Sequence, residues 1–302
     1  MTEKLPVLVT PGVPDNLIRL LESDFTLVRE PGPGIAILVT TGGDGADAAA
    51  MDACPDLRLI SVMAVGYDKV DVAYAKARGI AVTNTPDVLT DDVADLALAL
   101  MLSVFRRLPA QDLYVRQGRW ARDGNPPLSR SLSGRRIGIL GLGRIGRAIA
   151  ERVQPIAGEI AYYARGARAD APWRFEPDPV ELGRWSDVMV VAVAGGGPTK
   201  GLVSREVIGA LGPDGVLVNI ARGSVVDEPA LVEALVSGRL GGAGLDVFAD
   251  EPNVPEALLG LETVVLLPHQ GSATIETRGA MAKLAADNVI AFAGGGPLLT
   301  PV

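Results

Sequence analysis

The sequence contains one cysteine, one histidine and few aromatic residues, and each shortage limits what the protein can be. The lone Cys54 cannot form an internal disulfide, which fits a reducing compartment. Aromatic residues make up 4% of a chain that is 48% hydrophobic, so the core must be largely aliphatic. The longest apolar run, residues 96–105, is far shorter than the roughly 20 residues that span a bilayer. Because the first residues also lack a signal-peptide pattern, we expect a soluble cytoplasmic protein.

Positive charge is also in short supply, since the formal net charge is −8. An acidic surface repels phosphate backbones and anionic lipid headgroups. We therefore expect neither nucleic acid nor a membrane as a partner, and we expect no bound metal.

Short apolar runs typical of buried strands alternate with helical patterns, which indicates a parallel α/β fold. Four such runs occupy residues 6–10, 35–40, 57–62 and 79–84. Helices are predicted over residues 15–23 and 71–78, with Asp15 and Asp71 as N-caps. A Leu- and Ala-rich segment, residues 91–117, predicts one long helix or a helix pair, and a polar connector follows over residues 119–133.

A second series of strands begins after that connector and has the size of a complete doubly wound dinucleotide-binding domain. Its runs are residues 136–140, 159–164, 188–194, 215–220, 242–246 and 263–267. A last helix, about residues 274–293, lies too far along the chain for this sheet, so we place it on the first domain. The expected fold is α/β with two doubly wound domains. A Rossmann domain (residues 98–270) is inserted in a discontinuous, flavodoxin-like substrate domain (residues 1–97 and 271–302).

A glycine motif marks the start of the second series. Gly141, Gly143 and Gly146 form a G-x-G-x-x-G between a predicted strand and a helix expected over residues 147–153. Such glycines allow a tight turn and close approach to a pyrophosphate, and the helix N-terminus supplies free N–H groups to the phosphates. The motif therefore predicts a dinucleotide cofactor.

The end of the next strand predicts which dinucleotide binds. An NAD site places an acidic residue there for the ribose 2′-hydroxyl, but this chain has Arg165 and Arg168 and no acid. A guanidinium stabilises a 2′-phosphate through charge-assisted hydrogen bonds. We therefore expect NADP(H) to be preferred over NAD(H).

Three unusual residues follow later strands: Arg222, Glu251 and the only histidine, His269. Carboxyl ends of parallel strands meet at one edge of a sheet, where α/β proteins bind ligands. Arg222 can hold a carboxylate and polarise a neighbouring carbonyl. His269 can exchange a proton with the hydroxyl oxygen that results, and Glu251 can fix the imidazole tautomer and favour the imidazolium. The three residues predict acid–base chemistry on a small acid beside a nicotinamide.

With these motifs in place, the chain resembles the D-isomer-specific 2-hydroxyacid dehydrogenase family, and in particular its glyoxylate/hydroxypyruvate reductase branch. The resemblance covers nearly all residues. It rests on an ordered set of segments at residues 65–68, 84–86, 141–146, 221–223, 244–247, 251–252 and 268–274.

The resemblance implies a site. Arg222, Glu251 and His269 would be the catalytic residues, with Arg222 and His269 also touching substrate. Backbone N–H groups of Val65 and Gly66 would bind the substrate carboxylate, and family members are dimers joined through their nucleotide domains. Beyond the three motif glycines, residues expected to contact the cofactor are Thr90, Arg144, Ile145, Ala164, Arg165, Arg168, Ala194, Ala221, Arg222, Asp246, His269 and Gly271. Asp246 would meet the nicotinamide carboxamide, although a structural Asp at a strand end is the alternative.

The expected activity is NADPH-dependent reduction of a small 2-oxo acid of the glyoxylate or hydroxypyruvate type to its D-2-hydroxy acid. Two alternatives stay open. One is oxidation of formate or phosphite on the same scaffold, although formate dehydrogenases of this family pair the histidine with Gln and this chain has Glu251. The other is a dinucleotide-sensing binding protein without catalytic activity.

Overall fold

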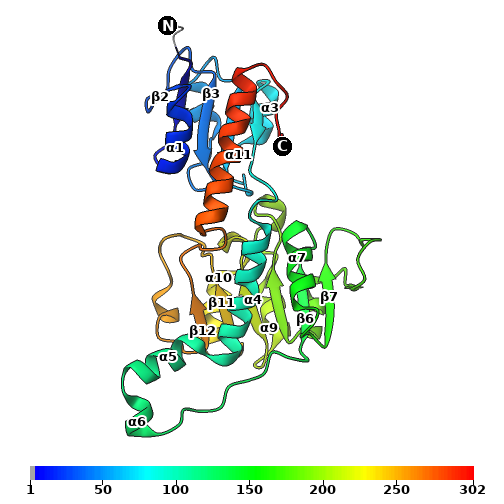
Figure 1. Cartoon of the computed structure of the whole chain (residues 1–302). Coiled ribbons are helices and arrows are strands. Elements are labelled where there is room, and N and C mark those ends of the chain that lie inside the picture. Colours follow the sequence, from blue (N-terminus) through cyan, green and yellow to red (C-terminus); the bar gives the residue numbers. More distant parts are fainter. Residues whose placement is uncertain (1–3) are drawn as a thin grey trace. The chain divides into compact units, whose positions relative to one another are not determined.

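The computed structural model describes residues 4–302, which divide into two compact units (Figure 1). Unit 1 runs to Leu89 and resumes at Ala273–Val302, and unit 2 is Thr90–Ser272. Each unit is built on one parallel sheet, so the predicted α/β class with two doubly wound sheets is confirmed. Unit 2 includes the whole of α4 (Thr90–Arg106), so it begins at Thr90 and not at the residue 98 that the sequence predicts.

Unit 1 has a five-stranded sheet of order β2-β1-β3-β4-β5, the flavodoxin-like arrangement. Its strands are β1 (Pro6–Val9), β2 (Thr26–Val28), β3 (Ile37–Thr41), β4 (Leu59–Met63) and β5 (Ala81–Thr83). Its helices are α1 (Asp15–Glu22), α2 (Ala48–Asp52), α3 (Val72–Ala77) and α11 (Ile275–Ala293). Helix α11 packs against α1 and β4, so the end of the chain completes the unit that the beginning starts (Figure 1).

Unit 2 has a seven-stranded parallel sheet of order β12-β11-β10-β9-β6-β7-β8. Its strands are β6 (Arg136–Leu140), β7 (Glu159–Tyr163), β8 (Arg174–Phe175), β9 (Val188–Val191), β10 (Val216–Asn219), β11 (Gly242–Leu245) and β12 (Val264–Leu266). Its helices are α4, α5 (Leu108–Arg116), α6 (Arg119–Asp123), α7 (Arg144–Val153), α8 (Pro179–Trp185), α9 (Arg205–Leu211) and α10 (Glu228–Val236). The strand order reverses between β6 and β9, and such a switch point is where doubly wound sheets bind ligands.

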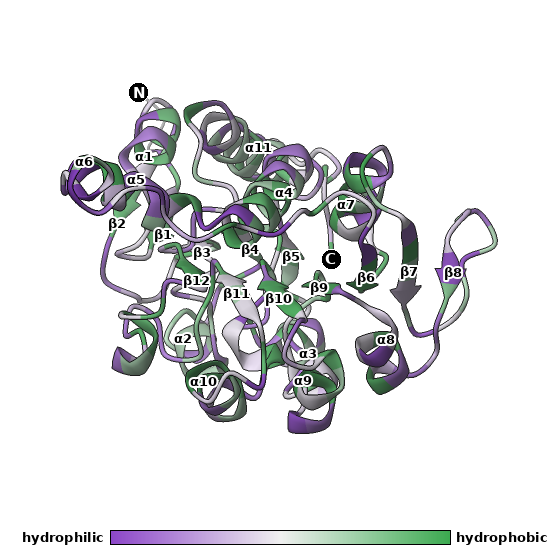
Figure 2. Cartoon of the chain, turned by 90° about the horizontal axis from the view of Figure 1, so that it is seen from below, coloured by the Kyte–Doolittle hydropathy of each residue, from purple (hydrophilic) through white to green (hydrophobic). Residues whose placement is uncertain are grey.

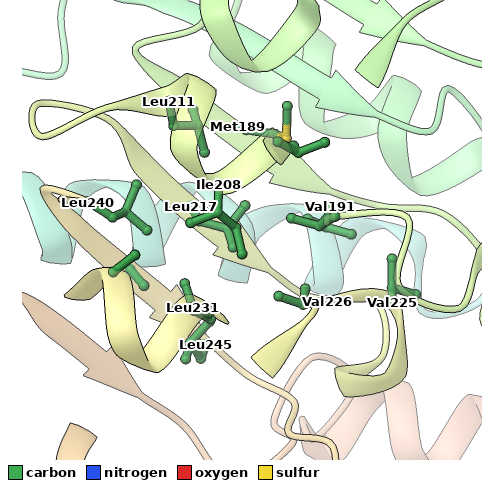
Figure 3. Close-up of a cluster of buried hydrophobic side chains, with 14 of the residues drawn as sticks. Met189, Val191, Ile208, Leu211, Leu217, Val225, Val226, Leu231, Leu240 and Leu245 are labelled. Atoms are coloured by element: carbon green, nitrogen blue, oxygen red, sulfur yellow. The ribbon is translucent and has the colours of Figure 1, made fainter. Parts of the chain in front are cut away.

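The core of unit 2 is aliphatic, as the shortage of aromatic residues requires. In Figure 2, α4 and α7 cover one face of the sheet and α8, α9 and α10 cover the other. Figure 3 shows Met189, Val191 and Leu217 from β9 and β10 packing with Ile208 of α9 and Leu231 of α10. All five side chains are buried. Because the strands are buried on both faces, they carry continuous apolar runs, which is why the sequence reveals them.

The N-termini of α1 and α3 can be compared with the N-caps predicted from the sequence. Asp71 is the N-cap of α3, and its side chain accepts a hydrogen bond from the Tyr74 N–H, as predicted. The prediction for Asp15 is wrong, because Asp15 already lies in the first turn of α1 and Pro14 is the cap. An acidic side chain in the first turn still interacts favourably with the helix dipole. The segment 91–117 is a helix pair, α4 and α5.

Helices α4 and α7 are joined by ion pairs at their exposed edges. Arg152 of α7 contacts Asp95 at 2.6 Å and Asp91 at 2.7 Å. The hydrogen bond to Asp95, followed by that to Asp91, raises the pKa of Arg152. The pairs link α4 to α7, and the first turn of α7 carries the glycine motif. Over residues 4–302, no helix has the length and hydropathy needed to cross a membrane.

Candidate active site

The glycine motif adopts the geometry that close binding of a pyrophosphate requires. Gly141 has φ +109°, a conformation that L side chains rarely adopt. A Cβ on Gly146 would lie 1.9 Å from the Gly141 carbonyl oxygen, so only glycine lets α7 start against this turn. A Cβ on Gly143 would meet nothing within 4 Å.

The first turn of α7 has no side-chain cap. Gly143 is the N-cap and provides no side-chain cap, and the helix continues with Arg144 and Ile145. The N–H groups of a helix N-terminus together with the helix dipole favour an anion at such a position. The turn therefore fits a dinucleotide, with open space where its phosphates would approach.

The loop after β7 carries the two arginines that the sequence singles out. Ala164 is half-buried, and the Arg165 and Arg168 side chains are exposed. Neither guanidinium has a hydrogen-bond or ion-pair partner within the part of the chain that the structure describes. Two such cations remain available for a ligand phosphate.

The loop after β10 is shaped by a buried amide side chain that the sequence reasoning did not single out. Asn219 is 1% exposed, its Oδ1 accepts the Ala221 N–H at 3.0 Å, and its Nδ2 donates to the Arg222 carbonyl at 3.0 Å. The Arg222 Nη1 in turn donates to the Ala221 carbonyl at 2.7 Å. These bonds fix the backbone that presents the half-buried Arg222.

This loop touches the segment that carries Glu251. A Cβ on Gly223 would lie 1.9 Å from the Phe248 carbonyl carbon, so the two backbones are in direct contact. Glu251 Oε1 accepts the Phe248 N–H at 3.0 Å, and Glu228 of α10 accepts the Ala249 N–H at 2.9 Å. No sequence pattern singles out Glu228, because its carboxylate contacts only a backbone N–H group of the loop.

Glu251 and His269 meet directly. The Glu251 Oε2 and His269 Nδ1 atoms are 2.8 Å apart, and the two side chains are 35% and 46% exposed. With Nδ1 bound to the carboxylate, Nε2 is the imidazole nitrogen left for a ligand. The pair has the arrangement of an acid–base histidine oriented by a carboxylate.

Asp246 fixes the segment that presents His269. Its carbonyl accepts the His269 N–H at 2.9 Å, and its carboxylate accepts the N–H groups of Gln270 at 2.5 Å and Gly271 at 2.8 Å. Asp246 is 1% exposed, and His269 has φ +55°, which is uncommon for a residue other than glycine. Both carboxylate oxygens thus bind the loop, which matches the structural alternative for a strand-end Asp.

The remaining predicted residues lie at segment ends in their own units. Val65 and Gly66 are half-buried in the loop after β4 of unit 1, where the Asn84 side chain donates to the Val65 carbonyl at 2.9 Å. In unit 2, Thr90 is the first residue of α4. The Ala194 carbonyl accepts the Thr199 hydroxyl at 2.6 Å, which closes the glycine-rich turn after β9.

Comparison with known proteins agrees with this geometry. The NAD-binding domain of the D-isomer-specific 2-hydroxyacid dehydrogenases matches residues 98–271. A hydroxyphenylpyruvate reductase from Plectranthus scutellarioides is 53% identical over 281 residues, covering 93% of this chain and 89% of that protein. Glyoxylate/hydroxypyruvate reductase A from Arabidopsis thaliana is 50% identical over 289 residues, covering 95% and 92%.

A solved structure is similar over its full length. An NADPH-dependent glyoxylate/hydroxypyruvate reductase from Sinorhizobium meliloti, in complex with NADP and malonate, superimposes with a TM-score of 0.93 at 44% identity, covering 99% of this chain and 97% of that one. The fold and the site thus define an oxidoreductase that uses a nicotinamide dinucleotide. The chain belongs to the D-isomer-specific 2-hydroxyacid dehydrogenase family.

Proposed function

We propose that this enzyme reduces a small 2-oxo acid of the glyoxylate or hydroxypyruvate type to the D-2-hydroxy acid, with NADPH as cofactor. The observation that carries the proposal is the 2.8 Å contact between His269 Nδ1 and Glu251 Oε2 in the unit that bears the dinucleotide motif. Relatives named as reductases of glyoxylate and hydroxypyruvate support the substrate class.

His269 is the proposed proton donor. When bound, NADPH supplies the hydride to the carbonyl carbon of the substrate. His269 Nε2 then gives its proton to the carbonyl oxygen, which becomes the hydroxyl. Glu251 holds Nδ1, orients the ring and stabilises the imidazolium before transfer. Positioned acid–base catalysis of this kind contributes roughly 100- to 10,000-fold in rate.

Arg222 is the proposed substrate clamp. Its guanidinium can donate two parallel hydrogen bonds to a carboxylate and polarise the adjacent carbonyl. We further propose that the backbone N–H groups of Val65 and Gly66 are substrate-carboxylate donors of unit 1. A 2-oxo acid supplies both groups, because its carboxylate and carbonyl are on adjacent carbons.

The cofactor proposal rests on the loop after β7. Arg165 and Arg168 are exposed cations where an NAD site would have an acid. Each charge-assisted hydrogen bond to a 2′-phosphate contributes roughly 1.5–3 kcal/mol, and about 1.4 kcal/mol is tenfold in affinity. The other proposed cofactor contacts are Thr90, Gly141, Gly143, Arg144, Ile145, Gly146, Ala164, Ala194, Ala221, Arg222, Asp246, His269 and Gly271.

Two sets of kinetic measurements test the proposal. The first measures kcat/KM for NADPH and NADH in the wild type, in a double Arg165→Gln and Arg168→Gln variant, and in a Lys76→Gln control on α3 of unit 1. We expect the wild type to prefer NADPH at least tenfold, the double variant to lose the preference, and the control to keep it. A wild type that prefers NADH contradicts the cofactor assignment.

The second set screens substrates with both cofactors: glyoxylate, hydroxypyruvate, pyruvate, phenylpyruvate, hydroxyphenylpyruvate and 2-ketogluconate, with chiral analysis of the product. We expect turnover of at least one 2-oxo acid to the D-hydroxy acid. If only phosphite or formate is turned over, the protein is a phosphite or formate dehydrogenase and not a 2-oxo acid reductase. Dinucleotide binding without any turnover would make the protein a sensor.

We also propose that the protein is a cytoplasmic homodimer. Large apolar side chains are exposed along α5, α6 and the connector that follows, and a partner subunit would cover them. They are Leu108 at 49%, Leu113 at 53%, Val115 at 55%, Trp120 at 58% and Leu128 at 96% exposed. Several large apolar side chains exposed along one segment of the chain are typical of an interaction site. The single, buried Cys54 supports a reducing compartment.

A further inference from the structure

The loop that carries Arg165 and Arg168 is tied to the buried side chain of Tyr162. Tyr162 lies in β7 and is 1% exposed, and its hydroxyl oxygen accepts the Arg168 backbone N–H at 2.7 Å. Its ring contacts Phe175 of β8, with 5.5 Å between the ring centroids. Since the sheet fixes the Tyr162 backbone and Phe175 fixes its ring, the hydroxyl is a rigid anchor for the loop.

A second anchor holds the far end of the same loop. Arg147 of α7 pairs with Asp170, with 2.7 Å between Nη2 and Oδ2, and its guanidinium lies 5.9 Å from the centre of the Trp173 ring. Helix α7 is also the helix whose first turn carries the glycine motif. The loop is therefore fixed at Arg168 by the sheet and at Asp170 by α7.

The anchors matter because of the groups that they position. The Arg165 and Arg168 guanidinium groups have no hydrogen-bond or ion-pair partner within residues 4–302, so nothing except the loop backbone determines where they lie. A long cationic side chain on a mobile backbone loses much of its binding energy to ordering, and preorganisation removes that cost.

We propose that the Tyr162 hydroxyl is a positioning group for selectivity toward a 2′-phosphorylated cofactor. It acts through the backbone of Arg168 and does not itself touch the ligand. This inference rests on the proposed preference for NADPH. It goes further by assigning part of that preference to a residue that faces the core.

The variant Tyr162→Phe removes the hydroxyl and keeps the ring. The adjacent Tyr163 provides a matched control, because its side chain is half-buried and its hydroxyl forms no hydrogen bond among the described residues. Unfolding temperatures of both variants check that the fold is intact.

Isothermal titration with adenosine 2′,5′-bisphosphate and with 5′-AMP isolates binding at the 2′-phosphate from turnover. For Tyr162→Phe we expect the Kd of the bisphosphate to rise about 3- to 10-fold while the Kd of AMP stays within about twofold. Tyr163→Phe should match the wild type for both ligands. The ratio of KM values for NADPH and NADH should shift by the same factor.

The outcomes separate this inference from the cofactor proposal. If the wild type binds AMP as tightly as the bisphosphate, the NADPH preference is wrong and this inference falls with it. If the wild type prefers the bisphosphate and Tyr162→Phe keeps the full preference, only the role of Tyr162 is wrong. If Tyr162→Phe raises the Kd of the bisphosphate and the Kd of AMP by the same factor, a selective role of Tyr162 is also contradicted.

Discussion

Glu251 and His269 are joined by a 2.8 Å contact between Oε2 and Nδ1, while the second oxygen of Glu251 accepts the Phe248 N–H. The carboxylate therefore holds the imidazole and is itself held by the backbone of its own loop. This double attachment sets the ring orientation.

The variant Glu251→Gln keeps the size of the side chain and removes its charge. A hydrogen bond to a charged group contributes about 1 kcal/mol more than a neutral one, so we expect kcat for the 2-oxo acid to fall about fivefold. The exposed Glu256 provides a control, since Glu256→Gln removes the same charge outside the site. Unchanged kcat in Glu251→Gln would show that the carboxylate does not assist the histidine.

The variant Arg222→Lys keeps the positive charge and loses the planar fork that binds a carboxylate through two bonds. We expect kcat/KM for the 2-oxo acid to fall on the order of 100-fold, with the Kd of NADPH changed much less. Steady-state kinetics and fluorescence titration measure the two quantities. The exposed Arg184 of α8 serves as the control for the same substitution. A fall in NADPH affinity with intact substrate kinetics would argue against a substrate clamp.

The variant Asp246→Asn replaces one of the two carboxylate oxygens by an amide NH₂ group, so only one side-chain oxygen remains to accept the two N–H groups of the loop. One of the N–H groups of Gln270 and Gly271 would then be buried without its partner, at a cost of roughly 1–3 kcal/mol. We expect unit 2 to unfold at a lower urea concentration than in the wild type. Tryptophan fluorescence monitors this transition, because Trp120, Trp173 and Trp185 all lie in unit 2. A midpoint equal to that of the wild type would mean that the loop does not depend on this carboxylate.

The exposed apolar side chains of the connector predict the oligomeric state. Light scattering after size exclusion should give twice the chain mass of 31.4 kDa. Leu128→Asp places a charge at the most exposed of these side chains and should shift the protein toward the monomer. Leu5→Asp, at an exposed leucine of unit 1, should leave the mass unchanged. A monomeric wild type would contradict the proposed dimer.

The sequence predicted elements well where burial on both faces makes a strand continuously apolar, as in β6, β9 and β10. It missed β2 and β8, which are three and two residues long. Their burial is only partial, so neither forms an apolar run, and they join the sheet edges by pairing with β1 and β7. The glycine motif was found because its spacing is fixed by backbone sterics.

The site was predictable only in part. Side chains with unusual chemistry at strand ends, such as His269 and Arg222, were visible in the sequence. Residues that act through backbone groups were not, because Asn219, Glu228 and Tyr162 are common types whose role depends on a loop folding back on them. Asp246 was noticed, but its three bonds to the loop became visible only in the structure.

The most direct test of the account is the kcat of His269→Asn, measured together with the Kd of NADPH. Because this is the only histidine, no other imidazole can replace it. We expect kcat to fall roughly 100- to 10,000-fold while NADPH binds within a few-fold of its wild-type affinity, with Gln270→Ala as a control that keeps its activity. A His269→Asn enzyme with near-normal turnover would contradict the assignment of the proton donor.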